Sequence, residues 1–271
     1  MNIYYLNHLN EKIDLDSENI ILQYQELFDY SWDAATSNNA IVSFYRDSAT
    51  IPVTVAITAD TDEEYSTILD DFHSTVSKDI IQLIPGKLYI GNQYLICYIS
   101  GDIKKDAFMG VPIQVKNLTI VTDHPVWIRE HPHSFKASEV TSTNNKRYPG
   151  RYAHRYANGL NNTTIVNVHY AESNFIMRIY GPCVKPSVYI GGYEYHSEIT
   201  LEAGEYLEID SMEETVTKIM LSGIRVNSFH YRSFKNSIFR PVPPGEQDIS
   251  WDGSFDFDLI LMEERSEPRW S

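Results

Sequence analysis

The chain has 271 residues and a net charge of −15, from 22 Lys and Arg against 37 Asp and Glu. That length is long for one domain and comfortable for two. The content of 42% hydrophobic and 22% charged residues is that of a globular protein, which excludes a disordered chain. The acidic balance argues against general nucleic-acid binding, which needs Lys and Arg to neutralise phosphates. The 19 Tyr favour a β-rich protein with contact surfaces, because tyrosine suits both sheets and interfaces.

The cysteines and the N-terminus indicate where the chain folds. Cys97 and Cys183 are too few for a disulfide scaffold and match no zinc pattern, so we expect free, buried thiols, as in a reducing cytoplasm. Residues 1–15 lack the basic and apolar segments of a secretory signal. No apolar run approaches the roughly 18 residues of a spanning helix, so no membrane span is expected.

The charge is distributed unevenly along the chain. Residues 1–80 hold 15 Asp and Glu against 3 Lys and Arg, whereas residues 131–171 hold 5 Lys and Arg against one Glu. Such asymmetry suits the orientation of subunits in an assembly. Two solvated faces of opposite charge explain it equally well.

The first predicted elements are a strand and a helix. Residues 51–58 alternate Ile and Val with smaller or polar residues, as in a half-buried strand. Thr61 and Glu64 match a capping box at a helix start. An apolar stripe with helical spacing then predicts a helix of about five turns. Its members are Tyr65, Ile68, Leu69, Phe72 and Val76.

A hairpin and two further strands complete the first predicted domain. After Pro85-Gly86 ends the helical unit, residues 88–90 and 94–97 are predicted as strands. They are joined by Gly91-Asn92, in which a leading glycine suits a type II′ turn. Further strands are expected at 113–121 and 126–128, which gives a domain over residues 1–130.

Residues 131–163 interrupt the strand pattern, and we expect the junction between two domains there. Residues 141–150 and 158–162 are rich in Thr, Ser, Asn, Gly and Pro, the composition of loops. Between them lies a basic and aromatic run. Arg and Tyr together favour interfaces, although a linker explains this run equally well. The candidate contact residues are Arg147, Arg151, Tyr152, Arg155 and Tyr156.

The remaining residues, 164–271, are predicted as a succession of short strands. Turn signals such as Gly191-Gly192, Ala203-Gly204 and Asp252-Gly253 recur roughly every 8 to 12 residues, the spacing of an all-β sandwich. We therefore expect a second β domain. Its predicted core residues are Val166, Val168, Phe175, Met177, Ile179, Val188, Ile190, Phe255, Phe257 and Leu259.

Motifs that carry catalysis are absent from the sequence. There is no GxSxG, P-loop, GxGxxG or HExxH pattern. The acidic run 60–64 could form a carboxylate pair for glycoside hydrolysis, but a helix start explains it better. His124, His131 and His133 lie close in sequence without an acidic or thiol partner at ligand spacing, so a surface loop is favoured over a metal site. We expect no catalytic residue, no metal and no cofactor.

Several segments resemble the distal tail (Dit) proteins of siphophages that infect Gram-positive hosts. The C-terminal stretches 243–251, 255–259 and 264–270 are similar to the ending of that family. The capped helix, then Gly86-Lys87-Leu88-Tyr89-Ile90 with Tyr94, and then Pro125-Val126-Trp127 match its N-terminal pattern in order and spacing. The tyrosine-rich stretch 148–156 resembles a further family segment. The resemblance thus covers most of the chain.

The resemblance implies a mainly β, non-enzymatic structural protein of the virion. Residues 1–130 would form a tail-tube-like β-sandwich or split barrel with one helix. Six copies would close a ring that continues the tail tube. Residues 164–271 would form a jelly-roll sandwich, like galectins and carbohydrate-binding modules, which holds other baseplate proteins. The implied partners are five more copies of the chain, the tail tube protein, the tail-associated (Tal) protein and receptor-binding proteins, assembled in the host cytoplasm into the tail tip.

Two other functions remain open on the residues alone. A carbohydrate-binding protein would hold host-surface glycan on an aromatic platform of the second sandwich. A hydrolase of cell-wall polymer would need an acid–base pair, which the sequence lacks.

Overall fold

The computed structural model describes residues 2–107, 112–137 and 161–270. It is mainly β, with one α-helix in those ranges, which confirms the predicted class. The chain divides into two compact units: unit 1 is Met1–Arg129 with Glu264–Ser271, and unit 2 is Glu130–Glu263. The expected boundaries therefore differ from the observed ones at the C-terminus, whose last residues return to unit 1. None of the helices in the described ranges is long and apolar enough to cross a membrane.

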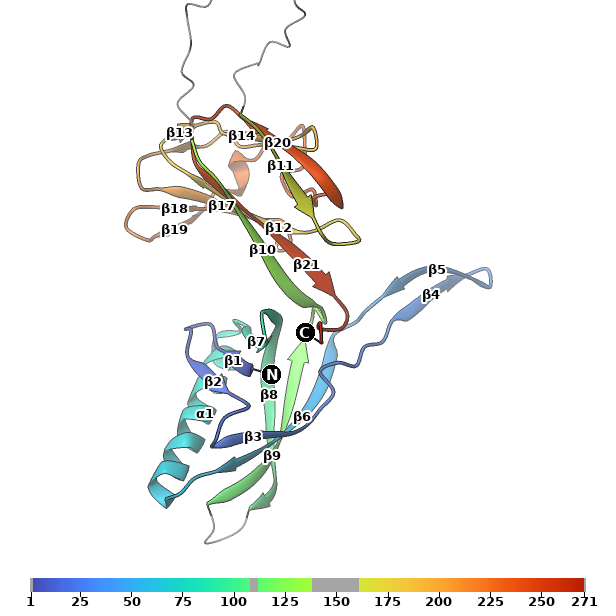
Figure 1. Ribbon diagram of the computed structural model, residues 1–271, viewed down its shortest axis with the longest axis vertical. Helices are drawn as coiled ribbons and strands as arrows, with labels where there is room; N and C mark the ends of the chain where they lie inside the picture. Colours follow the sequence, from blue (N-terminus) through green and yellow to red (C-terminus); the bar gives the residue numbers. More distant parts are fainter. Residues whose placement is uncertain (1, 108–111, 138–160, 271) are drawn as a thin grey trace, which may run out of the picture. The chain divides into compact units, whose positions relative to one another are not determined.

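In unit 1, two series of antiparallel strands share β8, the longest strand (Figure 1). One series runs β2-β1-β7-β8-β10 and the other β3-β6-β9-β8. The first part of β8 pairs with β7 and the remainder with β9. A bulge falls at Gly101, where a Cβ would lie 2.9 Å from Thr119 Oγ1. The strands are β1 (Ile3–Leu6), β2 (Lys12–Asp14), β3 (Ile20–Gln25), β4 (Asp33–Ser37), β5 (Ala40–Tyr45), β6 (Ala49–Thr58), β7 (Gly86–Ile90), β8 (Gln93–Ala107), β9 (Ile113–Thr122) and the beginning of β10 (Trp127–Phe135).

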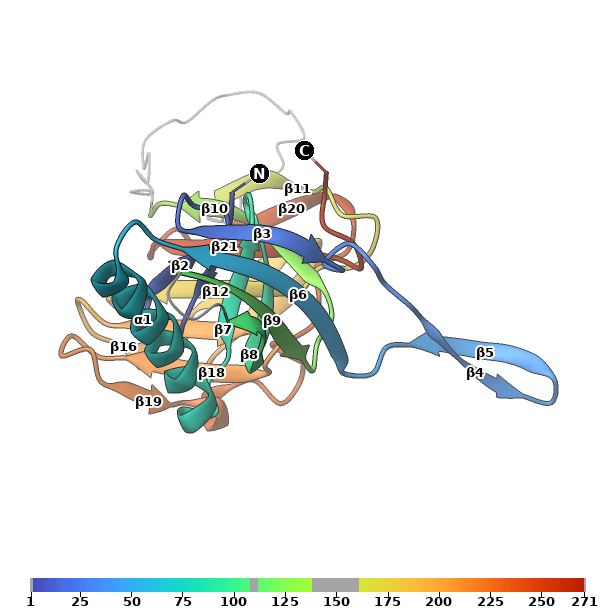
Figure 2. The same cartoon turned by 90° about the horizontal axis from the view of Figure 1, so that it is seen from below.

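The helix α1 (Asp62–Gln82) lies against the strands of unit 1 with the predicted stripe inward (Figure 2). Phe72 and Val76 are buried, and the other three members pack at the margin of the core. Thr61 Oγ1 accepts the amide of Glu64 at 3.2 Å. The Glu64 carboxylate instead accepts Asn19 Nδ2 at 2.9 Å, so only the threonine half of the predicted capping box forms. The helix continues beyond the predicted stripe and ends at Leu83, in the left-handed region with φ 54°.

A buried carboxylate joins α1 to the first strand. Asp79 is fully buried and accepts the Tyr5 hydroxyl at 2.5 Å. Its other oxygen accepts the backbone amide of His8 at 3.0 Å and contacts that residue's imidazole Nδ1. Burial and the bond to Asp79 raise the pKa of Tyr5 far above its ordinary value. Gly86 leaves room for this cluster, since a Cβ there would lie 2.4 Å from the Tyr5 hydroxyl.

In unit 2, two main sheets contribute side chains to one hydrophobic core. The first sheet has the order β19-β18-β17-β12-β21-β10, and the second β11-β20-β14-β15. The predicted turn at Gly191-Gly192 joins β14 to β15, with φ of 57° and 80°. The strands are β11 (Asn161–Asn167), β12 (Phe175–Tyr180), β13 (Cys183–Val184), β14 (Ser187–Ile190), β15 (Tyr193–His196), β16 (Thr200–Leu201), β17 (Tyr206–Asp210), β18 (Thr215–Ile219), β19 (Arg225–Asn227), β20 (Gly245–Trp251) and β21 (Phe257–Arg265), with a 3₁₀ turn η1 (Phe229–Tyr231).

Strands enter the expected junction at 131–163 from both sides. Strand β10 continues through His131 to Phe135, and β11 begins at Asn161. Phe135 is buried in the core of unit 2, where its ring stacks on Phe257 at 4.5 Å. The alternation was obscured because the half-buried positions of β10, on the face of Phe135, carry His131 and His133 in place of apolar residues.

The predicted inward face of β11 is also wrong. Val166 and Val168 are 54% and 57% exposed, whereas Ile165, Asn167 and His169 are buried. Asn167 takes the inward position because its amide donates to the carbonyls of Val242 and Pro243 at 3.0 and 3.2 Å. The other predicted core residues are buried, namely Phe175, Met177, Ile179, Val188, Ile190, Phe255, Phe257 and Leu259.

The division into units predicts which fragment folds alone. We expect residues 130–263 to unfold cooperatively in urea, because they hold the whole core of unit 2. Residues 161–271 lack β10 and should be less stable by about 3–5 kcal/mol, the cost of losing a buried aromatic ring. A Phe135→Ala variant of residues 130–263 measures the contribution of the ring to stability separately from that of strand β10. Equal urea midpoints for the two fragments would contradict this division.

The buried carboxylate predicts a local effect on stability. In the full chain, Asp79→Asn should lower the free energy of unfolding by about 1–3 kcal/mol, because the amide places a donor where only donors converge. Asp70→Asn, at an exposed position of the same helix, is the matched control and should change stability by less than about 0.5 kcal/mol. Similar urea midpoints for both variants would show that Asp79 does not anchor α1.

Candidate interaction surfaces

A two-stranded hairpin, β4–β5, extends away from the other strands of unit 1 (Figures 1 and 2). Its turn is Asn38-Asn39, with φ of 51° and 59°, and asparagine tolerates this left-handed conformation better than most residues. Ile41, Val42 and Phe44 are 60%, 63% and 58% exposed. A bulge between Ala35 and Thr36 places Ile41 on the same face as Phe44, and Tyr45, which is 46% exposed, lies on the opposite face. Apolar groups therefore lie on both faces of the hairpin.

An exposed hairpin of this composition needs a partner surface. An isolated two-stranded hairpin is marginally stable in water, and contiguous exposed apolar groups mark interaction sites. The hairpin is absent from the sequence-based expectations, although Asn38-Asn39 between two strand-like runs is the signal that could have revealed it. It is the most prominent candidate interface of unit 1.

The two stems of the hairpin are clamped to the body of unit 1. Trp32 precedes β4 and Arg46 follows β5, and the guanidinium carbon of Arg46 lies 4.3 Å from the Trp32 ring centroid. Arg46 Nη1 also donates to the carbonyl of Pro125 at 2.6 Å. This stacking fixes the direction in which the hairpin leaves the unit.

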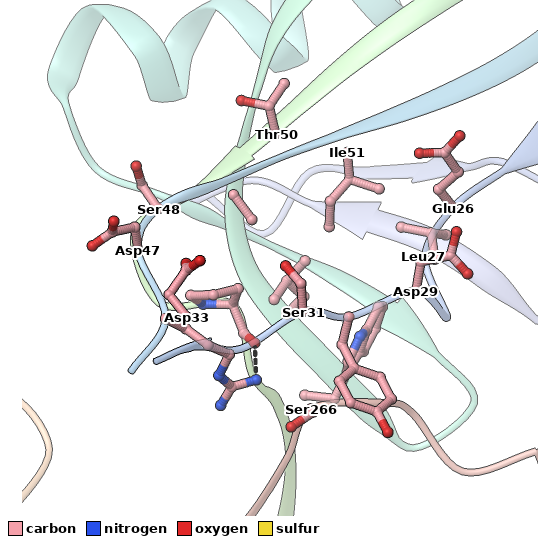
Figure 3. Close-up of a pocket in the computed structure, with 16 residues that line it drawn as sticks. Glu26, Leu27, Asp29, Ser31, Asp33, Asp47, Ser48, Thr50, Ile51 and Ser266 are labelled. Carbon is pink, nitrogen blue, oxygen red and sulfur yellow. Dashed lines mark hydrogen bonds between the residues drawn. The ribbon is translucent and has the colours of Figure 1, made fainter. Parts of the chain in front are cut away.

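Beside this clamp lies a hollow of about 390 Å³ (Figure 3). Glu26 and Asp29 lie toward one end, and Asp33 and Asp47 toward the other. The carboxylates are therefore distributed between the two ends of the hollow. A rim of this charge suits a basic side chain better than an anionic one. The hollow is also lined by Leu27, Tyr30, Ser31, Arg46, Ser48, Ala49, Thr50, Ile51, Leu95, Pro125, Trp127 and Ser266.

The C-terminal segment packs on unit 1. The Trp270 ring stacks on Phe28 at 4.1 Å, and the amide of Arg269 donates to Gln93 Oε1 at 2.9 Å. His124 Nε2 lies 3.4 Å from Glu264 Oε2, and that hydrogen bond raises the pKa of His124 against the opposing effect of burial. These contacts explain why the last residues belong to unit 1.

The basic and aromatic contact residues expected from the sequence lie outside the described residues. They are Arg147, Arg151, Tyr152, Arg155 and Tyr156. Their role as an interface stays a prediction.

The histidines occupy different surroundings from those expected. His131 has an acidic partner after all, Glu263, at 3.0 Å, contributed by a strand distant in the sequence. Burial, together with the nearby His131, lowers the pKa of His133. In the described part of the chain, no group of three or more His, Cys, Asp or Glu side chains could hold a metal ion.

The remaining reactive groups are occupied structurally. Cys97 and Cys183 are buried free thiols, as predicted. Burial raises the pKa of both, and that of Cys183 to about 11, so neither is a ready nucleophile at neutral pH. The acidic run 60–64 lies at the start of α1, where negative charge stabilises the helix.

No protein-family profile matches this chain, and no curated protein is a sequence match to it. Solved structures do match it along almost its full length. The Dit protein of phage SPP1, described as a paradigm of the hub adsorption apparatus in phages infecting Gram-positive bacteria, aligns with a TM-score of 0.57 and 10% identity over 97% of this chain and 98% of its own.

Two structures of the phage P2 baseplate in its activated conformation also match. Each aligns with a TM-score of 0.60 and 13% identity over 98% of this chain. The alignment covers 98% of the baseplate chain in the structure with calcium and 99% in the structure with strontium. The structural neighbours are thus phage hub and baseplate proteins. At these identities the likeness establishes the fold, and it confirms at that level the resemblance seen in the sequence.

Proposed function

We propose that this protein is the structural hub at the distal end of a phage tail, a member of the distal tail family. The observation that carries the proposal is the full-length match in fold, across both units, to a phage hub protein and to phage baseplate chains. The independent resemblance of the N-terminal and C-terminal segments supports it. The protein would then act in the virion, at the tail tip, after assembly in the host cytoplasm.

The proposed assembly is a closed ring of six copies built by unit 1. A closed ring needs a heterologous interface, in which one patch meets a different patch of the next copy. The hairpin β4–β5 supplies one such patch, because it projects from unit 1 with apolar side chains on both faces. In the ring, these side chains would be buried against the neighbouring copy.

Unit 1 would continue the tail tube, and unit 2 would hold the receptor-binding or other baseplate proteins. The tail-associated protein would attach to the same ring. The common core of two sheets in unit 2 supports the jelly-roll assignment. The two units thus divide ring formation from partner attachment.

The ring predicts a specific effect of hairpin variants. Val42→Asp combined with Phe44→Asp should abolish incorporation into six-copy rings, because both charges would be buried at the contact. Ser43→Asp, on the intervening position, is the milder matched control. The measurement is the number of copies at the tail tip in averaged electron micrographs, with native mass spectrometry of isolated tips. Three or five copies, or intact rings of the double variant, would refute the proposal.

The absence of catalysis is part of the proposal and has its own test. The sequence lacks the GxSxG, P-loop, GxGxxG and HExxH motifs, and both thiols have raised pKa values. Incubation of the full chain with purified cell walls should release no reducing ends or free amines above buffer, with lysozyme as the positive control. Turnover that disappears in a single Asp or Glu variant would identify an enzyme instead.

A further inference from the structure

Unit 2 contains a basic region in an otherwise acidic chain. Residues 215–245 include five Lys and Arg and no Asp or Glu, whereas the whole chain has a net charge of −15. Lys218 and Arg225 are paired with glutamates of β17 and its preceding turn. The other three basic residues are Arg232, Lys235 and Arg240. Within the described residues, none of them has a carboxylate partner.

Arg232 is held in place by aromatic rings. Its guanidinium carbon lies 3.8 Å from the ring centroid of Phe229 and 4.9 Å from that of Phe234. Its Nη1 donates to the Phe229 carbonyl at 3.0 Å. The planar group is therefore fixed before any partner arrives, with donors left for a carboxylate, the anion whose geometry it matches.

Exposed apolar side chains surround this arginine. Phe234 is 81% exposed, Tyr231 41% and Phe229 38%. Beside them a hollow of about 290 Å³ is bounded by Phe229 and by residues of β18 and β19. Its lining residues are Glu214, Thr215, Val216, Thr217, Arg225, Asn227 and Phe229.

The loop that presents these groups is internally braced. The Phe229 amide donates to Asn227 Oδ1 at 3.0 Å, and the Tyr231 amide donates to the Ser228 carbonyl at 2.9 Å. The Tyr231 carbonyl accepts the amide of Glu198 at 2.8 Å. A preformed surface loses little conformational entropy on binding.

We propose that this surface, formed by Phe229, Tyr231, Arg232 and Phe234 and called here the Phe229 surface, binds an acidic segment of a partner protein that also carries apolar side chains. A carboxylate of the partner would pair with Arg232 between the two phenylalanine rings. An apolar side chain would enter the hollow against Phe229. Lys235 adds favourable long-range attraction for the acidic segment.

A protein segment fits this surface better than other polyanions. A phosphate polymer would be attracted by the cations but would leave Tyr231 and Phe234 without apolar contacts. A lipid surface would not use the hollow. Arginine with aromatic rings around a hollow is the composition of protein-binding hot spots. The inference does not rest on the tail-hub function, since it needs only unit 2.

The test is a selection of 12-residue peptides from a random display library on the immobilised full chain. Enriched peptides should combine Asp or Glu with aromatic or aliphatic residues. Their affinity, measured by fluorescence anisotropy, should fall about tenfold or more for Arg232→Gln and for Phe234→Ala. Arg232→Lys should also weaken binding, because it keeps the charge but loses the stacked fork.

The controls separate this surface from general attraction. Lys136→Gln removes a basic residue of unit 2 whose side chain is 76% exposed and should leave affinity unchanged. Circular dichroism would verify that each variant is folded; Phe234 is too exposed to be needed for folding. The proposal is overturned if no selected peptide depends on Arg232 and Phe234. It is equally overturned if only phosphatidylglycerol vesicles or poly(glycerol phosphate) bind, or if the variants change self-association alone.

Discussion

The arrangement of unit 1 depends on one buried carboxylate. Asp79 has no exposure to water, and its two oxygens accept from Tyr5 and His8 at the beginning of the chain. A buried carboxylate is costly unless each oxygen has a donor, so α1 is held where β1 supplies them. With α1 fixed, the stripe around Phe72 packs into the core of unit 1, to which β6, the strand that follows the hairpin, also contributes.

Unit 2 contains a comparable constraint made from a neutral side chain. Asn167 is inside, where it accepts from Ser173 and from the amide of His169 and donates to two carbonyls before β20. A buried amide with these partners fixes the register of β11, because a shift by one residue would move the amide away from both carbonyls and from the Ser173 hydroxyl. It also turns Val166 outward, onto the exposed face of an edge strand.

In both units, buried ionisable side chains are bonded internally: Asp79 accepts from Tyr5, Lys116 pairs with Asp102 and Glu263 with His131. The cysteines are buried thiols of raised pKa. What reaches the surface is an apolar hairpin, an acidic hollow beside it and, in unit 2, an arginine stacked between phenylalanines. These are candidate contact surfaces of different charge, which suits the proposed attachment of unlike proteins.

The sequence by itself determined the elements that depend on near neighbours. The stripe from Tyr65 to Val76 specified α1, and glycine at position 91 and at 191–192 specified two hairpin turns, because these signals act within a few residues. Only the tertiary structure decided that Asn167 is buried in place of Val166, that His131 meets Glu263, and that the last residues return to unit 1. Those outcomes depend on partners far away in the chain. A polar side chain is predicted to lie at the surface as long as its buried hydrogen-bond partners are not known.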